Sequence, residues 1–241
     1  MLKILLLPFA LSVISPFVEA FPEPQANIGN VNPTQNTSSS TACANIHIIV
    51  VRASTENPGQ GVIGTLATMI SGAIPGSTVE AIDYPALLNP YGSSSSNGTT
   101  TTTKQLQKYV DTCNKASVVL LGYSQGAHVV GDVMCGGGQA TSLGPSTPPI
   151  AKKYQDKVVA MIQMGDPRHV AQASFDIGSS QRNGIFPRPA NISCNAIAAK
   201  IRSYCDSGDP FCDMGDDVQV HLSYTRRYNK DAYDFTISQL K

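Results

Sequence analysis

Short apolar runs rich in β-branched residues alternate along this chain with segments whose apolar residues recur every three or four positions. The strand-like runs are Ile46–Val51, Thr78–Ile82, Ser117–Leu121 and Lys157–Met164, while Ala196–Ser203 carries both signals. Helical spacing covers Val62–Ile70, Lys104–Cys113, a segment through Val129, Val130 and Val133, and Asp231–Leu240. Strands that alternate with helices predict an α/β fold, in which helices cover both faces of a parallel sheet.

The first 42 residues do not follow this pattern. Lys3 precedes a short apolar stretch, and Val18-Glu19-Ala20 is typical of a signal-peptidase site, so residues 1–20 are predicted to be a secretory signal peptide. A permanent membrane anchor is the alternative, but the stretch is shorter than the roughly 18 apolar residues that a span needs. Residues 21–42 are rich in Pro, Asn and Ser and are expected to form a flexible leader. We expect the remaining domain, residues 43–241, to be secreted, monomeric and not associated with a membrane.

Composition narrows the classes of function. Of the 241 residues, 41% are hydrophobic and only 14% are charged, and 17 Lys and Arg balance 17 Asp and Glu. Nucleic-acid binding depends on clustered cationic side chains, so the zero net charge argues against a nucleic-acid partner. The chain has no Trp, which argues against an appended polysaccharide-binding module built on a stacking Trp platform.

The cysteines fit an oxidising compartment, because their number is even. They are Cys43, Cys113, Cys135, Cys194, Cys205 and Cys212. Many pairings are open, but Cys205 and Cys212 enclose only six residues and form the natural local pair. No Cys-x-x-Cys pair or His–Cys cluster with zinc spacing occurs, so neither a metal nor another cofactor is expected. Asn36, Asn97 and Asn191 each begin an N-x-S/T sequon and are candidate glycosylation sites.

The most informative motif is Gly122-Tyr123-Ser124-Gln125-Gly126, which matches the G-x-S-x-G pattern between an apolar strand and a helix. A sharp strand-to-helix turn strains the serine backbone, and the flanking glycines leave room for the crossing chain. Ser124 would then project from the carboxyl edge of the sheet as a nucleophile, with the Gln125 backbone N–H as the first oxyanion donor. The alternative is an ordinary tight turn with a buried serine.

A serine hydroxyl needs a base to take its proton, and the base needs a carboxylate to orient it. The chain has four histidines: His47, His128, His169 and His221. On this class of fold the chain order is serine, acid, histidine, so His47 and His128 come too early and are expected to be packed or surface imidazoles. His169 and His221 remain as candidates.

Two acid–base pairs compete. Asp209 lies in the small Cys205–Cys212 loop, where a disulfide would hold it rigidly, and His221 follows on another loop. The rival pair is Asp166 and His169, which should share one loop. We favour Asp209 and His221, because small misplacements of an orienting carboxylate are costly in rate. The other acids of this region are expected to form a solvated rim: Asp206, Asp213, Asp216 and Asp217.

Several motifs taken together resemble the cutinase and acetylxylan esterase family of secreted fungal hydrolases, from about residue 43 to the C terminus. They are Arg52–Glu56, Gly122–Gly126, Cys135–Gly138, Met164–Pro167, Ser203–Cys212 and His221. The resemblance implies a small, lidless α/β hydrolase with a central five-stranded parallel sheet. It places the nucleophile on Ser124, the acid on Asp209 and the base on His221. The second oxyanion position falls on Ser54, whose backbone N–H and hydroxyl would join the Gln125 N–H.

The resemblance also implies the disulfides and a structural role for Asp166. The implied pairs are Cys43–Cys113, Cys135–Cys194 and Cys205–Cys212. The substrate would be an acylated polysaccharide or a polyester. Phe211 stands where acetylxylan esterases have a Tyr that narrows the acyl pocket, and it favours short acyl groups over the long groove that a cutin monomer needs. A cutinase is the alternative within the family, and a non-catalytic secreted protein with a hydrolase frame is the alternative outside it. A protease is disfavoured, because the resemblance offers no pocket for a peptide side chain.

Overall fold

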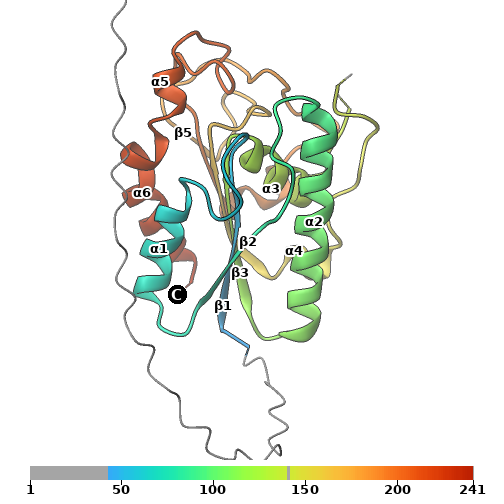
Figure 1. Cartoon of the computed structure of the whole chain (residues 1–241), viewed down its shortest axis with the longest axis vertical. Helices are drawn as coiled ribbons and strands as arrows, with labels where there is room; N and C mark the ends of the chain where they lie inside the picture. The colour runs from blue at the N-terminus through green and yellow to red at the C-terminus, as the bar shows by residue number, and fades with distance from the viewer. Residues whose placement is uncertain (1–42, 140–141, 241) are drawn as a thin grey trace, which may run out of the picture. The chain divides into compact units, whose positions relative to one another are not determined.

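The computed structural model describes residues 43–139 and 142–240. The predicted signal peptide, the leader and the Asn36 sequon lie outside these residues. Within the described part, six parallel strands form one sheet in the order β2-β1-β3-β4-β6-β5 (Figure 1). Their bounds are β1 Ile46–Val51, β2 Thr78–Ala81, β3 Ser117–Tyr123, β4 Val158–Met164, β5 Asp176–Ile177 and β6 Ile201–Tyr204. The predicted parallel α/β architecture is confirmed, but the expected number of five strands is wrong, because the two-residue β5 adds a sixth.

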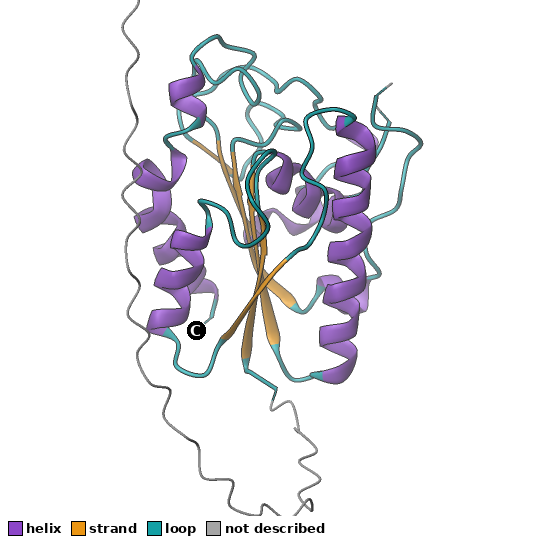
Figure 2. Cartoon of the chain, in the orientation of Figure 1, coloured by secondary structure: helices purple, strands orange, loops and turns teal. Residues whose placement is uncertain are grey.

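Helices cover both faces of the sheet (Figure 2). One face carries α1, Gly64–Ala73, and α6, Tyr224–Gln239. The other carries α2, Tyr91–Thr112, with α3, Gln125–Cys135, and α4, Lys152–Gln155. The shorter elements are the 3-10 helices Ala190–Ile192 and Asn195–Lys200 and the one-turn helix α5, Val218–His221. The segment Ala196–Ser203, whose sequence carries both helix and strand signals, spans the end of the second 3-10 helix and the start of β6.

The central strands are buried because they face a hydrophobic core on each side. In β1, Ile48 and Val50 pack into the core beneath α1 and α6, whereas Ile49 and Val51 pack into the core beneath α2 and α3. Neighbouring strands run in register, and Val51 of β1 lies opposite Gly122 of β3. The loops that follow β1, β3, β4 and β6 therefore leave the same carboxyl edge of the sheet.

Two helices begin well before the residues where sequence periodicity becomes clear. The first is α2, which begins at Tyr91 rather than Lys104, although after Tyr91 its first half consists of Ser, Thr, Asn and Gly. Tertiary contact holds this half in place: a Cβ added to Gly98 would lie 2.8 Å from both the Tyr84 ring and the Val129 side chain. The second is α6, which begins at Tyr224.

Three disulfides tie the loops to this frame: Cys43–Cys113, Cys135–Cys194 and Cys205–Cys212. These are the pairs that the family resemblance implies. The first joins the chain before β1 to the end of α2, and the third closes the loop after β6. No helix in residues 43–139 or 142–240 is both long and apolar enough to cross a membrane.

Candidate active site

The turn between β3 and α3 holds Ser124 in a strained backbone conformation. Its φ is 53° and its ψ is −117°, and its backbone N–H donates to the Met164 carbonyl at 2.8 Å. A Cβ on Gly122 would lie 2.3 Å from the Gly126 oxygen, and one on Gly126 would lie 2.0 Å from the Val51 oxygen. Glycine is therefore required on both sides, which is the steric reason that the sequence motif predicts.

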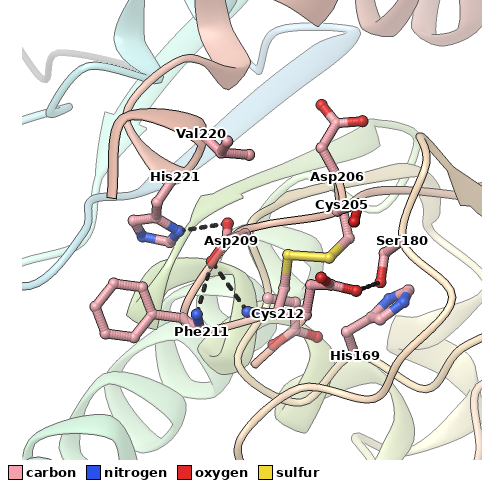
Figure 3. Close-up of a disulfide and its surroundings, with 12 residues drawn as sticks. His169, Ser180, Cys205, Asp206, Asp209, Phe211, Cys212, Val220 and His221 are labelled. Atoms are coloured by element: carbon pink, nitrogen blue, oxygen red, sulfur yellow. Dashed lines mark hydrogen bonds and ion pairs between the residues drawn. A yellow bond between two sulfur atoms is a disulfide. The ribbon is translucent and has the colours of Figure 1, made fainter. Parts of the chain in front are cut away.

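The structure brings His221 and Asp209 together at the same edge of the sheet. His221 Nδ1 lies 2.8 Å from Asp209 Oδ2 (Figure 3). The other carboxylate oxygen accepts the backbone N–H groups of Phe211 at 2.7 Å and Cys212 at 3.1 Å. Asp209 is fully buried, which alone would raise its pKa. Its hydrogen bonds with His221, the Phe211 N–H and the Tyr224 hydroxyl outweigh burial and hold the pKa of Asp209 below its ordinary value.

His221 is the last residue of α5, so its expected place on a loop is wrong. This short helix forms because Asp217 caps it: Asp217 Oδ1 accepts the Gln219 backbone N–H at 2.9 Å. The Tyr123 hydroxyl, next to the serine in sequence, donates to the His221 carbonyl. The histidine is thus held from two sides, by the acid at its ring and by β3 at its backbone.

Ser124 and His221 line one cavity of about 540 Å³. Apolar and aromatic side chains form most of its wall, among them Leu88, Tyr91, Phe186 and Phe211. Among the described residues, Ser124 Oγ makes no hydrogen bond to His221, although both side chains border the same space. In free enzymes such bonds are often long and tighten only when substrate is bound.

A second set of groups converges on the cavity from the loop after β1. Ser54 lines the cavity, and its hydroxyl is buried without a hydrogen-bond partner among residues 43–139 and 142–240. Glu56 shapes this loop, since its carboxylate accepts the backbone N–H groups of Ala53 at 2.6 Å and Val62 at 2.7 Å. Arg52 is buried beneath the loop and donates to the Glu56 carbonyl at 3.0 Å. Sequence reasoning did not find this role for Arg52 and Glu56, because it depends on contacts across the loop.

The rival pair is not assembled. Asp166 accepts Gln163 Nε2 at 2.8 Å and the Arg168 backbone N–H at 2.9 Å, which is a structural role. Neither ring nitrogen of His169 has a hydrogen-bond partner among the described residues, and Nδ1 lies 3.6 Å from Asp176 Oδ1. Neither Asp166 nor His169 lines the cavity that Ser124 borders.

The prediction that four acids of this region form a solvated rim is correct for two of them and wrong for the other two. Asp216 and Asp217 are exposed, but Asp206 and Asp213 are buried. Asp206 accepts the Tyr228 hydroxyl at 2.8 Å, and Asp213 accepts the Ser180 hydroxyl at 2.6 Å. Through these hydrogen bonds both carboxylates hold the disulfide loop that carries Asp209 in place. They are therefore buried structural groups and not solvated surface charges.

The remaining predicted sites can be placed more briefly. Asn97 on α2 and Asn191 in the first 3-10 helix are both exposed, as glycosylation sites must be. Within the part of the chain that the structure describes, no three His, Cys, Asp or Glu side chains gather so as to hold a metal ion. His47 is buried and stacks on Tyr109, with ring centroids 3.6 Å apart. His128 is buried in a hydrogen-bonded chain behind the cavity.

A serine on a strand-to-helix elbow and a buried histidine–aspartate pair, at the carboxyl edge of a parallel sheet, define the class of α/β serine hydrolases.

The family model described as Cutinase matches residues 42–240. Cutinase 11 of Verticillium dahliae is 35% identical over 207 residues, which cover 83% of this chain and 70% of that protein. Acetylxylan esterase 2 of Talaromyces purpureogenus is 34% identical over 216 residues, which cover 86% and 92%. A solved acetylxylan esterase structure superposes with a TM-score of 0.78 at 34% identity, covering 83% of this chain and all of that one. The chain belongs to the cutinase family.

Proposed function

We propose that this chain is a secreted serine esterase in which Ser124 is the nucleophile, His221 the base and Asp209 the acid that orients it. The observation that carries the proposal is the 2.8 Å bond between the buried Asp209 and His221 Nδ1, on a histidine that borders the same cavity as the elbow serine. That bond places the Nδ1 proton toward the carboxylate, so Nε2 keeps the lone pair that a base needs. The three disulfides support an extracellular location.

The reaction follows from these positions as two acyl transfers. Ser124 Oγ attacks the ester carbonyl while its proton passes to His221 Nε2, and the carbonyl oxygen becomes an oxyanion. We assign the stabilisation of that oxyanion to the backbone N–H groups of Ser54 and Gln125 and to the Ser54 hydroxyl. In support, Ser54 lines the cavity, and its hydroxyl is buried without a hydrogen-bond partner among the described residues. His221 then returns the proton to the leaving alkoxide oxygen as the C–O bond breaks. Water, activated by His221, releases the acid and restores Ser124.

For the substrate, we propose a short acyl ester, such as the acetyl groups of an acetylated plant polysaccharide like xylan. Two observations support it: Phe211 supplies a bulky wall to the cavity, and relatives at 34–35% identity bear the name acetylxylan esterase. A polyester of the cutin type is the second candidate. It is favoured by the apolar rim of the cavity, where Leu88, Ile185 and Leu222 are 58%, 38% and 61% exposed.

The test is a set of hydrolysis rates on p-nitrophenyl acetate, butyrate and hexadecanoate, beside acetate release from acetylated xylan and monomer release from cutin. We expect the highest kcat/KM on acetate and measurable release from xylan, all abolished in a folded Ser124→Ala variant. Faster hydrolysis of hexadecanoate and cutin would assign the cutinase activity instead. A folded wild-type chain that hydrolyses no ester would make it a non-catalytic member of the family and overturn the proposal.

A further inference from the structure

The loop between β1 and α1, residues 52–63, carries Ser54, and one glutamate side chain joins its two ends. Glu56 Oε2 accepts the Ala53 backbone N–H at 2.6 Å, and Glu56 Oε1 accepts the Val62 backbone N–H at 2.7 Å. The first bond fixes the residue directly before Ser54, and the second fixes the chain where it approaches α1. A single carboxylate thus closes the loop around Ser54.

The Glu56 carboxylate can occupy this place because residue 61 is a glycine. Gly61 has a φ of 59°, and a Cβ there would lie 2.1 Å from Glu56 Oε2 and 2.8 Å from Arg52 Cβ. A methyl group at this position would therefore push the carboxylate away from the two N–H groups. Arg52 holds the backbone of the same glutamate, since its Nε donates to the Glu56 carbonyl at 3.0 Å and its guanidinium also donates to the Ile82 carbonyl at 3.1 Å.

The N–H groups on either side of Ser54 are engaged, whereas that of Ser54 is free. The Ala53 N–H donates to Glu56, and the Thr55 N–H donates to the Ala86 carbonyl at 2.7 Å. In the part of the chain that the structure describes, the Ser54 N–H makes no hydrogen bond, and the buried Ser54 hydroxyl has no partner. Two unused donors of one residue therefore border the cavity that contains the nucleophile.

The backbone directly after Ser54 is strained. Thr55 has a φ of 66°, in the left-handed region that a β-branched residue rarely adopts. Such a conformation persists only where the surroundings hold it in place. The bond from Ala53 to the Glu56 carboxylate and the bond from Thr55 to the Ala86 carbonyl hold it from its two sides. Without the carboxylate the loop is free to relax, and the Ser54 donors then change position.

Glu56 has two effects on an oxyanion in this cavity, and they have opposite signs. It lines the same cavity as Ser54 and Ser124, so its charge opposes the build-up of negative charge on the substrate. Because the side chain is partly exposed, this repulsion is screened by water and changes the rate by less than about tenfold. Misplacement of a catalytic group by about 1 Å costs about 10²-fold. The placement of the donors therefore outweighs the repulsion.

We propose, resting on the function proposed above, that Glu56 is a positioning residue for the oxyanion site. Its carboxylate holds the loop in the shape that keeps the N–H and the hydroxyl of Ser54 available to the oxyanion. Glu56 acts through Ser54 and does not itself contact the reacting atoms. Gly61 leaves room for the carboxylate, and Arg52 holds the glutamate backbone.

The test measures kcat and KM on p-nitrophenyl acetate for the full chain and its variants, beside the inhibition constant Ki of trifluoroacetone. In the proposed mechanism the Ser124 oxygen adds to the ketone carbon, its proton passes to His221, and the ketone oxygen becomes an oxyanion with no leaving group to expel. Ki therefore reports on the oxyanion site. Unlike kcat, Ki does not depend on the fraction of the chain that is folded.

Glu56→Ala removes both acceptors and is expected to lower kcat about 10²-fold with little change in KM, and to raise Ki by a similar factor. Glu56→Gln should have a smaller effect of the same sign, because an amide offers one oxygen to the two N–H groups. Gly61→Ala keeps the carboxylate but displaces it, and should also lower kcat and raise Ki. If Glu56→Ala does not fold, the other two variants make the same comparison.

A double-mutant cycle links the effect to Ser54. Ser54→Ala removes one donor from the same oxyanion, so Glu56→Ala should cost at least about threefold less in the Ser54→Ala background than in the wild type. Effects that simply multiply would show that Glu56 acts elsewhere and would overturn the inference.

The matched control is Asp176→Asn. Asp176 Oδ2 also accepts a backbone N–H, that of Ala173 at 2.8 Å, but Asp176 does not line the catalytic cavity. This variant should change the melting temperature and leave kcat and Ki unchanged. An active Glu56→Ala variant with the wild-type Ki, or with a raised kcat, would overturn the inference and leave the proposed esterase function intact. A folded wild-type chain without esterase activity would overturn both.

Discussion

Replacing Asp209 by Asn tests how the acid acts, because the structure fixes the way in which an amide can fit. Asp209 Oδ1 receives two backbone N–H groups, from Phe211 and Cys212, so the Asn oxygen must take that position. The amide NH₂ then occupies the place of Oδ2 and faces His221 Nδ1 and the Tyr224 hydroxyl. Two donors cannot bond, so Nδ1 becomes the acceptor, and the imidazole proton moves to Nε2, where it blocks proton transfer from Ser124.

We expect Asp209→Asn to lower kcat by about 10⁴-fold, which corresponds to about 5 kcal/mol of transition-state stabilisation, with little change in KM. The assay is hydrolysis of p-nitrophenyl acetate at saturating substrate, with circular dichroism to show that the variant is folded. Tyr224→Phe is the matched control, because it removes a neutral donor from the same oxygen without reversing the tautomer, and it should cost less than about tenfold. A folded Asp209→Asn variant with a loss no larger than that of Tyr224→Phe would refute the role of Asp209.

Three further predictions concern other parts of the frame. Replacing Cys205 and Cys212 by Ser opens a short loop, and should lower the free energy of unfolding in urea by about 2 to 3 kcal/mol; unchanged stability would contradict this. Burial raises the pKa of Asp176 to about 7, above its unfolded value. Between about pH 4 and 7 the folded chain therefore binds more protons than the unfolded chain, so its stability falls as the pH rises through that window. Because the Asp176 carboxyl is partly exposed, we expect the loss to be only about 1 to 2 kcal/mol. Asp176→Asn should flatten this dependence in melting temperatures from pH 4.5 to 8, and an identical slope would refute it. Ser54→Ala should lower kcat about 10²-fold without loss of stability, because the hydroxyl has no partner among the described residues; unchanged kcat would exclude it from the oxyanion site.

The elbow could be predicted from sequence because its geometry is local. The turn needs glycine at 122 and 126, where any Cβ would overlap a backbone oxygen, and the sequence supplies both. The pairing of Asp209 with His221 rather than Asp166 with His169 could also be predicted, from chain order and from the rigidity of a disulfide loop. Both kinds of evidence are present in the order of residues along the chain.

What could not be predicted depends on contacts between distant segments. The strand β5 has only two residues and shows no periodicity of its own, since it exists by pairing with β6. The first half of α2 has a composition that disfavours helix, and it is stabilised where Gly98 allows close approach to Val129. Asp206 and Asp213 have the pattern of surface acids in the sequence, because their hydrogen-bond partners Tyr228 and Ser180 lie far away along the chain.

The most direct measurement of the whole scheme is covalent capture of the nucleophile. The full chain is treated with a fluorophosphonate, which phosphonylates an activated serine with loss of fluoride, and the modified peptide is mapped by mass spectrometry. We predict a single adduct on Ser124, absent from Ser124→Ala and strongly slowed in Asp209→Asn. An adduct on another serine, or equal labelling of wild type and Asp209→Asn, would contradict the assignment of Ser124, His221 and Asp209 as one catalytic unit.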